Sequence, residues 1–298
     1  MPPAIIPNRL HFIWLGARLP EKYAANLLSW LIANPAYEVH LWTESGMVDV
    51  NREAVLDALK TRDDYHPLLN VTTADVFDGK LLTFEGKDPI PHQLLIQTIA
   101  TVPAISDPGL LYEEMSAWKN YGAASDILRL WVLHHRGGIY MDFDTEMDGG
   151  KPLPLLIRAP LGILFADFHD GTKTWVCNAI MAAAENSPNV LESAKALEKA
   201  YDTHYPENRL SRCITTEHLM GLNKVIEARH EHAIGGRYAH MLSATIGVYM
   251  ANPTYERGAS IVTGGIGCEF VPAIYNDISF QKQSGYNPIL RSDDSWQK

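Results

Sequence analysis

The stretch that most constrains the fold runs from Gly122 to Asp148, GAASDILRLWVLHHRGGIYMDFDTEMD. Its first part spaces apolar residues at intervals of three and four, which is typical of a helix with one apolar face. Gly137 and Gly138 then end the helix, because glycine adopts left-handed backbone conformations without a steric cost. Residues 139–144 alternate apolar and polar, which is the period of a strand. The stretch therefore predicts a helix, a tight turn and a short strand.

Asp142 and Asp144 fall two residues apart in this strand pattern, so we expect both carboxylates on one face at the end of the strand. Two carboxylates held that close are costly unless a cation joins them. Hard oxygen ligands suit Mg²⁺ or Mn²⁺, and such ions usually also hold a phosphate of the substrate. A D-x-D pair by itself is a very weak signal and is more often a polar strand edge. The helix, double glycine and strand around it favour a metal site.

The segment AASDILRLWVLHHRGGIYMDFDTEM resembles the sugar-nucleotide-binding D-x-D region of GT-A glycosyltransferases. It is similar both to the catalytic domains of large clostridial glucosylating toxins and to Och1-like and capsular sugar transferases. The match joins A-x-S-D-x-x-R, G-G-x-Y and D-x-D at fixed spacing. The resemblance implies an α/β chain with the GT-A fold, Rossmann-like in its nucleotide-binding part. It also implies Mn²⁺ or Mg²⁺ as cofactor and a UDP-sugar as donor.

The resemblance assigns roles to five residues of this stretch. Asp126 and Arg129 would contact the ribose and the sugar of the donor, and Tyr140 would help to hold that pocket. Asp142 and Asp144 would bind the metal and the diphosphate, with Asp144 favoured as the direct ligand.

The chain opens with an apolar run, Leu10 to Trp14, that predicts a buried strand. A helix over residues 20–33 and a strand over residues 37–42 follow, so a Rossmann-like β-α-β unit is expected. Trp14 would lie near a nucleotide pocket, because ligands of open α/β sheets sit beyond the carboxyl ends of the strands. The strand pattern alone favours a core tryptophan. However, I-P-x-x-x-H-F-I-W-x-G resembles the opening strand of the same transferases, in which the tryptophan stacks on uracil.

We interpret the chain as one domain, residues 1–298, with a helical insertion over about residues 46–120. Residues 50–60 and 92–100 are the expected helices of that insertion, which several prolines divide into short pieces. Farther on, Asn178 lies in a segment that resembles the part of the family that passes close to the transferred sugar. Asn178 could hydrogen-bond the sugar or the acceptor, and a buried amide with satisfied hydrogen bonds is an equal alternative.

Two later segments carry candidate ligands. Residues 287–298 resemble a C-terminal lid of toxin-type transferases, in which Asp293 or Asp294, Ser295 and Trp296 would supply two metal ligands and a ring for stacking. Such a lid would exclude water and favour transfer over hydrolysis. Without the resemblance, a chain end of this composition is usually solvated. The His230–His232 cluster could serve metal or acid–base chemistry, but a solvated surface is favoured.

Composition narrows the function further. The chain has 298 residues and a formal net charge of −10, which argues against nucleic acid as partner. Its three scattered cysteines form neither a disulfide framework nor a zinc motif. We see no basic, apolar secretory leader and no apolar run long enough to span a membrane. The expected location is the cytoplasm, or the cytosol of a host that an exported effector enters.

The sequence thus predicts a metal-dependent hexosyltransferase that moves a hexose or N-acetylhexosamine from a UDP-sugar. A host protein side chain is the favoured acceptor, as for a bacterial toxin or effector, and the resemblance implies retention at the anomeric carbon. A glycan- or polysaccharide-building transferase is the alternative within the same chemistry. A sugar-nucleotide-binding module without turnover is the alternative from another class. A metal-dependent phosphohydrolase would need more acidic motifs than the chain offers.

Overall fold

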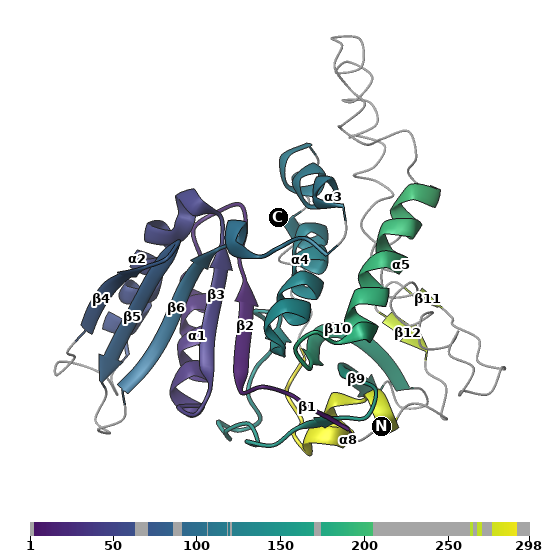
Figure 1. Ribbon diagram of the computed structural model, residues 1–298. Helices are drawn as coiled ribbons and strands as arrows, with labels where there is room; N and C mark the ends of the chain where they lie inside the picture. Colours follow the sequence, from purple (N-terminus) through teal and green to yellow (C-terminus); the bar gives the residue numbers. More distant parts are fainter. Residues whose placement is uncertain are drawn as a thin grey trace, which may run out of the picture.

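A computed structural model describes most of the chain (Figure 1). The described residues are 3–62, 71–85, 91–105, 107–117, 119, 121–169, 174–204, 263–264, 267–269 and 276–290. The strands are β1 Ala4–Ile5, β2 Arg9–Ile13, β3 Glu38–Thr43, β4 Val71–Val76, β5 Gly79–Glu85, β6 Pro91–Thr98, β7 Gly138–Met141, β8 Arg158–Ala159, β9 Ile163–His169, β10 Thr174–Ala183, β11 Thr263–Gly264 and β12 Gly267–Glu269. The α-helices are α1 Glu21–Ala33, α2 Val48–Lys60, α3 Pro108–Tyr112, α4 Tyr121–Arg136, α5 Pro188–His204 and α8 Phe280–Ser284. Ser45–Met47 and Ile99–Thr101 are 3₁₀ turns, and Glu113–Ala117 is a π-helical turn.

One mixed sheet organises the fold, with the strand order β11-β12-β10-β7-β2-β3-β6-β5-β4 and β9 paired to β10. Its centre is parallel: β2 pairs with β3 and β7, and β3 pairs with β6. The outer strands pair in antiparallel fashion. The predicted α/β class is confirmed, and so is the opening β-α-β unit, which is β2-α1-β3.

The central helix, turn and strand are also confirmed. Helix α4 ends at Arg136, and Gly137 follows with φ +58°, the left-handed conformation expected of a helix stop. Gly138 starts β7 with φ +99° and packs directly on the backbone of Arg9 in β2. This close approach brings the end of α4 against the parallel centre of the sheet.

The region predicted as a helical insertion is corrected by the structure. Residues 50–60 lie in a helix, α2, as expected, but residues 92–100 are mostly strand β6. Strands β4 and β5 form a hairpin that continues the sheet beyond β6. In β6 the buried residues alternate with more exposed ones, a period of two that Leu95 obscures in the sequence. The segment therefore extends the sheet instead of packing helices beside it.

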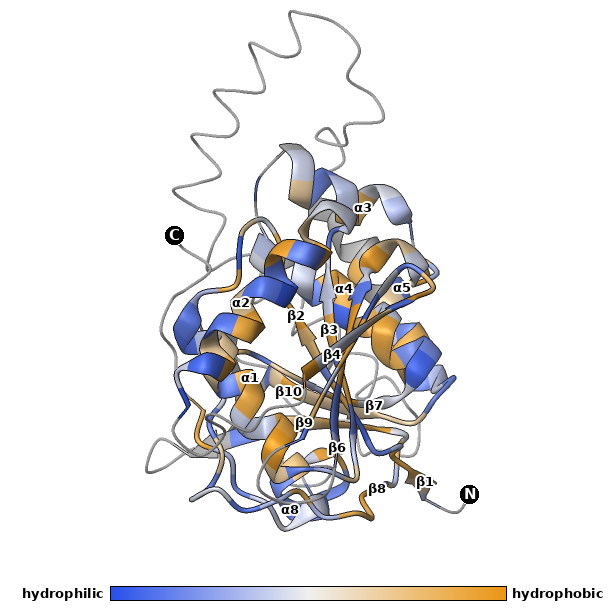
Figure 2. Cartoon of the chain, turned by 90° about the vertical axis from the view of Figure 1, so that its left-hand side faces the viewer, coloured by the Kyte–Doolittle hydropathy of each residue, from blue (hydrophilic) through white to orange (hydrophobic). Residues whose placement is uncertain are grey.

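Two hydrophobic cores lie on opposite faces of the sheet. One core packs α1 and α2 against the side chains of β2 and β3 that include Leu10, Phe12 and Leu41. The other packs α4 and α5 against Ile13 and Trp42 from the other face of the same strands. Figure 2 shows the strands between these helical layers, with the hydrophobic sides of the helices turned inward. No helix in the described ranges is long and apolar enough to cross a membrane.

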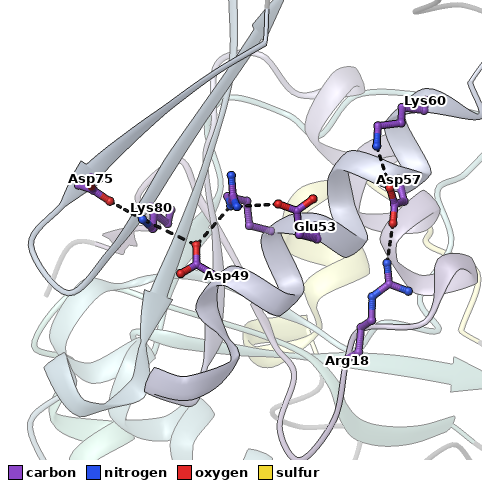
Figure 3. A network of polar contacts seen from close by, with 8 residues as sticks. Arg18, Asp49, Glu53, Asp57, Lys60, Asp75 and Lys80 are labelled. Atoms are coloured by element: carbon purple, nitrogen blue, oxygen red, sulfur yellow. Dashed lines mark hydrogen bonds and ion pairs between the residues drawn. The ribbon is translucent and has the colours of Figure 1, made fainter.

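The outer face of α2 is charged and faces solvent (Figure 3). Asp57 pairs with Lys60 at 2.9 Å and with Arg18 at 2.7 Å, and Lys80 of the β4–β5 hairpin lies 3.7 Å from Asp49. Such exposed pairs each contribute about 0–1 kcal/mol, so they add little stability. The charges of opposite sign compensate one another, and this face therefore offers no concentrated charge to a ligand.

Candidate active site

The strand order locates a ligand site. Strand β2 has β3 on one side and β7 on the other, and both pairings are parallel. The chain leaves β2 toward β3 and later returns to the opposite side of β2 as β7. In open α/β sheets, ligands bind at such a switch point, beyond the carboxyl ends of the strands. Trp14 directly follows β2 and Asp142 directly follows β7, so both lie at this point.

Asp142 and Asp144 belong to a turn, which corrects the expectation that they share one face of a strand. Strand β7 ends at Met141, and the amide of Thr145 donates to the carbonyl of Asp142 at 3.0 Å, closing the turn. The amide of Asp142 donates to the carbonyl of Ala179 in β10 at 2.8 Å. The two carboxylates are therefore fixed by a tight turn at the end of the strand, and both are partly exposed.

Two side chains of helix α1 form hydrogen bonds with the backbone of this turn. The Asn26 side-chain amide donates to the carbonyl oxygens on both sides of Asp144, at 2.9 Å for Phe143 and 2.7 Å for Thr145. The indole of Trp30 donates to the Thr145 carbonyl at 3.0 Å. Sequence reasoning missed Asn26. The one sequence feature that could have indicated Asn26 is its position beside the apolar face of the helix. A polar side chain buried there needs a hydrogen-bond partner, which the backbone of another segment can supply.

A buried cluster around Arg129 lies next to the turn. We call it the arginine cluster; it consists of Ser125, Asp126, Arg129, Tyr140 and Asn178. Nη2 of Arg129 lies 2.7 Å from Oδ1 of Asp126 and 3.3 Å from Oδ1 of Asp142, and Nη1 donates to the Asn178 carbonyl at 2.6 Å. The guanidinium carbon sits 4.2 Å from the centre of the Tyr140 ring. The cluster thus joins α4, β7 and β10 around one buried cation.

Tyr140 connects the arginine cluster to the D-x-D turn. Its hydroxyl donates to Oδ1 of Asp142 at 2.5 Å and lies 3.2 Å from Oγ of Ser125. Burial raises the pKa of Tyr140 well above its usual value, so the hydroxyl keeps its proton and remains a donor. The structure therefore brings together four predicted residues, Asp126, Arg129, Tyr140 and Asp142.

Asp126 has an unusual electrostatic environment. The pKa of Asp126 is raised to about 7, chiefly by burial. The charge of Arg129 opposes this rise, the charge of Asp142 adds to it, and the hydrogen bond from Asn178 opposes it. Nδ2 of Asn178 donates to Oδ1 of Asp126 at 2.8 Å. A carboxyl group whose pKa is near neutrality and that lies beside a fixed cation is a common feature of functional sites.

Trp14 lies against the D-x-D turn. Its ring is 5.5 Å, edge to face, from that of Phe143, which separates the two aspartates, and 5.3 Å from that of Tyr23. Its indole nitrogen donates to the Ala17 carbonyl at 3.0 Å. Trp14 is only partly buried, so the structure places an aromatic ring with some exposed surface beside the two carboxylates. Stacking on a base stays a prediction.

The C-terminal segment reaches the same place. Ile289 and Glu146 exchange two backbone hydrogen bonds of 2.9 Å, two residues beyond Asp144. The hydroxyl of Tyr286 donates to the Lys151 carbonyl at 3.0 Å. The predicted lid residues Asp293, Asp294, Ser295 and Trp296 lie outside the described residues, as does the His230–His232 cluster.

The chemistry of the turn fits a hard divalent cation. Asp142 and Asp144 offer carboxylate oxygens, the ligand type that Mg²⁺ and Mn²⁺ prefer, and the Asp142 side chain is 32% exposed. In the described part of the chain, no group of three or more His, Cys, Asp or Glu side chains comes together that could hold a metal ion. A complete ligand set would therefore need further oxygens from the substrate, from water or from other parts of the chain.

Comparison with known proteins defines the class first. The family model described as a glycosyltransferase sugar-binding region containing a DXD motif matches residues 20–156. A second model, the TcdA/TcdB catalytic glycosyltransferase domain, matches residues 106–266, more than half of the chain. The chain belongs to this TcdA/TcdB glycosyltransferase domain family. The resemblance predicted from the sequence is thereby confirmed, and the GT-A fold class agrees with the sheet described above.

Curated relatives include two bacterial proteins, one of which is named a toxin. "Subversion of eukaryotic traffic protein A" of Legionella pneumophila is 27% identical over 198 residues, 66% of this chain. "Toxin Afp18" of Yersinia ruckeri is 27% identical over 205 residues, 67% of this chain. The matched region spans only 26% of the first relative and 8% of the second.

Solved structures with similar folds include the PaToxG glycosyltransferase, at a TM-score of 0.47 and 20% identity, covering 83% of this chain and 79% of that chain. The UDP-bound glycosyltransferase domain of the YGT toxin follows at a TM-score of 0.46 and 14% identity, covering 81% of this chain and 72% of that chain.

Proposed function

We propose that the chain is a metal-dependent glycosyltransferase that moves a hexose or N-acetylhexosamine from a UDP-sugar to an acceptor. One observation carries the proposal: the D-x-D turn and the arginine cluster meet at the switch point between β2 and β7. A partly exposed tryptophan, two carboxylates and a buried cation with its acidic partner match the three parts of such a donor. These parts are a base, a diphosphate and a sugar.

The difficult step is departure of the diphosphate from the anomeric carbon. Mn²⁺ or Mg²⁺ held by Asp142 and Asp144 would act as a Lewis acid that offsets the charge developing on the leaving group. Arg129 supplies a cation that its neighbours fix in place before the donor arrives. Asp126 accepts a hydroxyl of the ribose or sugar, and Trp14 stacks on the uracil. These residues contribute through positioning and electrostatics.

The C-terminal lid is part of the proposal, with Asp293 and Ser295 as further metal ligands and Trp296 as a second ring against the base. The pairing of the C-terminal segment with residues just beyond the D-x-D turn supports the proposal that the lid can reach the site. Ile289 is hydrogen-bonded to Glu146, and an extended chain advances at most about 3.3–3.6 Å per residue. Asp293 is four residues beyond this anchor, so roughly 14 Å of chain is available to approach Asp144.

For the acceptor we propose a side chain of a host protein, with the enzyme acting in the host cytosol after export and with retention at the anomeric carbon. The family and the printed names of two curated relatives, "Subversion of eukaryotic traffic protein A" and "Toxin Afp18", support this choice over a glycan-building enzyme. A sugar-nucleotide-binding module without turnover is the alternative from another class. The D-x-D turn and the arginine cluster disfavour it, because both are complete in the described residues.

The test is UDP release from a panel of UDP-sugars, with Mn²⁺ and with a chelator, for the wild type and the double variant Asp142→Asn/Asp144→Asn. Metal-dependent release from one donor, lost in the double variant, would support the proposal and name the sugar. Asp148→Asn is the matched control, because this nearby carboxylate pairs with Lys151 at the surface. No release and no metal-dependent binding would refute the proposal. Binding without release, even with host-cell lysate as acceptor, would favour the non-catalytic module.

A further inference from the structure

Strand β10 is irregular where it passes the site. On its β9 side, Cys177 pairs with Ala166, but the next pair is Met181 with Phe165. Residues 178–180 therefore have no partners on β9, which makes this a β-bulge of three residues. On its other side the same segment still holds β7, because Ile180 pairs with Met141 and the Ala179 carbonyl accepts the Asp142 amide. Bulges next to active sites commonly re-aim a side chain.

The side chain that this bulge redirects is Asn178. Its side-chain amide reaches α4 and donates to Oδ1 of Asp126 at 2.8 Å, while its backbone carbonyl accepts Nη1 of Arg129 at 2.6 Å. One residue thus holds both members of the Asp126–Arg129 ion pair. Asn178 is only 1% exposed, so its amide is buried behind Asp126 and does not face a ligand.

These contacts divide the two oxygens of Asp126. Oδ1 accepts a hydrogen bond from Nδ2 of Asn178 and forms the ion pair with Nη2 of Arg129. Among the described residues, none forms a hydrogen bond or an ion pair with Oδ2. The terminal torsion of an aspartate has a broad energy minimum, so the carboxylate plane is set by its partners. Two donors that converge on one oxygen fix this plane and leave the other oxygen to accept a hydroxyl.

We propose that Asn178 is a positioning residue for the donor: it orients Asp126 so that Oδ2 accepts a sugar or ribose hydroxyl, and it does not touch the donor itself. The inference rests on the proposed function. Of the two alternatives for Asn178, a hydrogen bond to the sugar or acceptor and a buried amide with satisfied hydrogen bonds, it takes the second and adds an action through Asp126. The β10 bulge is then the structural device that supplies the orienting amide.

A double-mutant cycle tests the assignment, with UDP release from the donor that the wild type uses as the readout. The four proteins are the wild type, Asn178→Leu, Asp126→Asn and the combined variant. Asn178→Leu nearly conserves volume and keeps the backbone carbonyl that binds Arg129. We expect it to lower kcat/KM for the donor by about 10- to 100-fold, the range for losing a hydrogen bond to a charged group. The combined variant should be no slower than Asp126→Asn alone, because residues that act through one another are not additive.

Asn34→Leu is the matched control for burial and folding. Asn34 is 2% exposed and its side chain also makes two hydrogen bonds, to the Trp30 carbonyl at 2.8 Å and from the Leu153 amide at 2.6 Å. It lies at the end of α1, away from the arginine cluster. We expect it to lower the melting temperature at least as much as Asn178→Leu while leaving kcat/KM nearly unchanged. The affinity for Mn²⁺ without donor should be the same in both variants and the wild type.

The outcomes separate the two proposals. A wild type that turns over no UDP-sugar would overturn the proposed function and this inference with it. In an active wild type, additive effects in the cycle would overturn only the role of Asn178, since they would mean that it acts independently of Asp126. Equal losses of kcat/KM in Asn34→Leu and Asn178→Leu would also overturn the role of Asn178, because they would show a general effect of destabilisation.

Discussion

The turn between α4 and β7 permits a quantitative test of how the site is held. Gly138 has φ +99°, and a Cβ at this position would lie 2.7 Å from the Arg9 carbonyl oxygen and 3.0 Å from Nε2 of His11. Neither neighbour can move easily. Arg9 pairs with Glu38 of β3 in the sheet, and Nε2 of His11 donates to the Gly137 carbonyl at 2.8 Å. Gly138→Ala must therefore strain the backbone and displace the parallel centre of the sheet.

The magnitude follows from two contributions. Left-handed backbone costs a residue other than glycine about 1–2 kcal/mol, and overpacking a filled site costs about 1–3 kcal/mol. Gly138→Ala should thus lower the free energy of unfolding by about 2–5 kcal/mol. Gly149 also has positive φ, +56°, but its Cβ would meet nothing within 4 Å. Gly149→Ala should therefore lose only about 1–2 kcal/mol.

Urea unfolding of both variants and of Gly46→Ala measures the two contributions. Gly46 has neither positive φ nor a neighbour within 4 Å of its Cβ, so alanine there should be neutral or stabilising by about 0.4–1 kcal/mol. The expected order of stability is Gly46→Ala, then Gly149→Ala, then Gly138→Ala. If Gly138→Ala lost no more stability than Gly149→Ala, the close approach of the turn to β2 would not be a constraint, and the reasoning would be wrong.

Three further predictions concern the site and its surroundings. Tyr140→Phe removes the donor to Asp142 and should weaken Mn²⁺ binding by about 0.5–1.5 kcal/mol, measured by titration calorimetry, because the partly exposed carboxylate recovers some hydrogen bonding from water. Asn26→Ala leaves the two carbonyls around Asp144 without their amide donor and should weaken Mn²⁺ binding while leaving the position of Asp126, and hence metal-free nucleotide binding, unchanged. Burial lowers the pKa of His11 well below 6.5, so the folded protein keeps this histidine neutral while the unfolded chain takes up a proton below about pH 6.5. The free energy of unfolding should consequently fall as the pH decreases from 7 to 5, and this dependence should flatten in His11→Gln; an unchanged slope would show that other groups cause it.

Local pattern predicted the elements around the site well. The 3.6-residue period of α4, the stop at Gly137 and the short strand after it depend on interactions between near neighbours, and all three are in the structure. The strand before Trp14 was predicted for the same reason. The predicted end of β7 was wrong by a few residues. The alternation of apolar and polar residues continues through Asp144, but the strand ends at Met141 and a hydrogen bond from the Thr145 amide to the Asp142 carbonyl forms a turn.

The region of β4 to β6 shows where local pattern fails. Strand β6 is buried between β3 and β5, and Leu95 on its less buried face hides the alternation that would have predicted it. Pairing with β5 and with β3, which lies far away in the sequence, decides that residues 91–98 are extended. The predicted helix at residues 50–60, by contrast, needed only its own apolar face.

The sequence by itself determined which residues we propose for the chemistry, because D-x-D, A-x-S-D-x-x-R and G-G-x-Y fix residue types at short spacings. Tertiary structure decided how these residues are held. The Asn178 amide meets Asp126 across 52 positions of the chain, and the Asn26 amide meets the turn across more than a hundred. Such contacts depend on strand order, on a bulge and on the packing of α1 against the turn that follows β7. No period in the sequence encodes them, since each arises only when distant segments pack together.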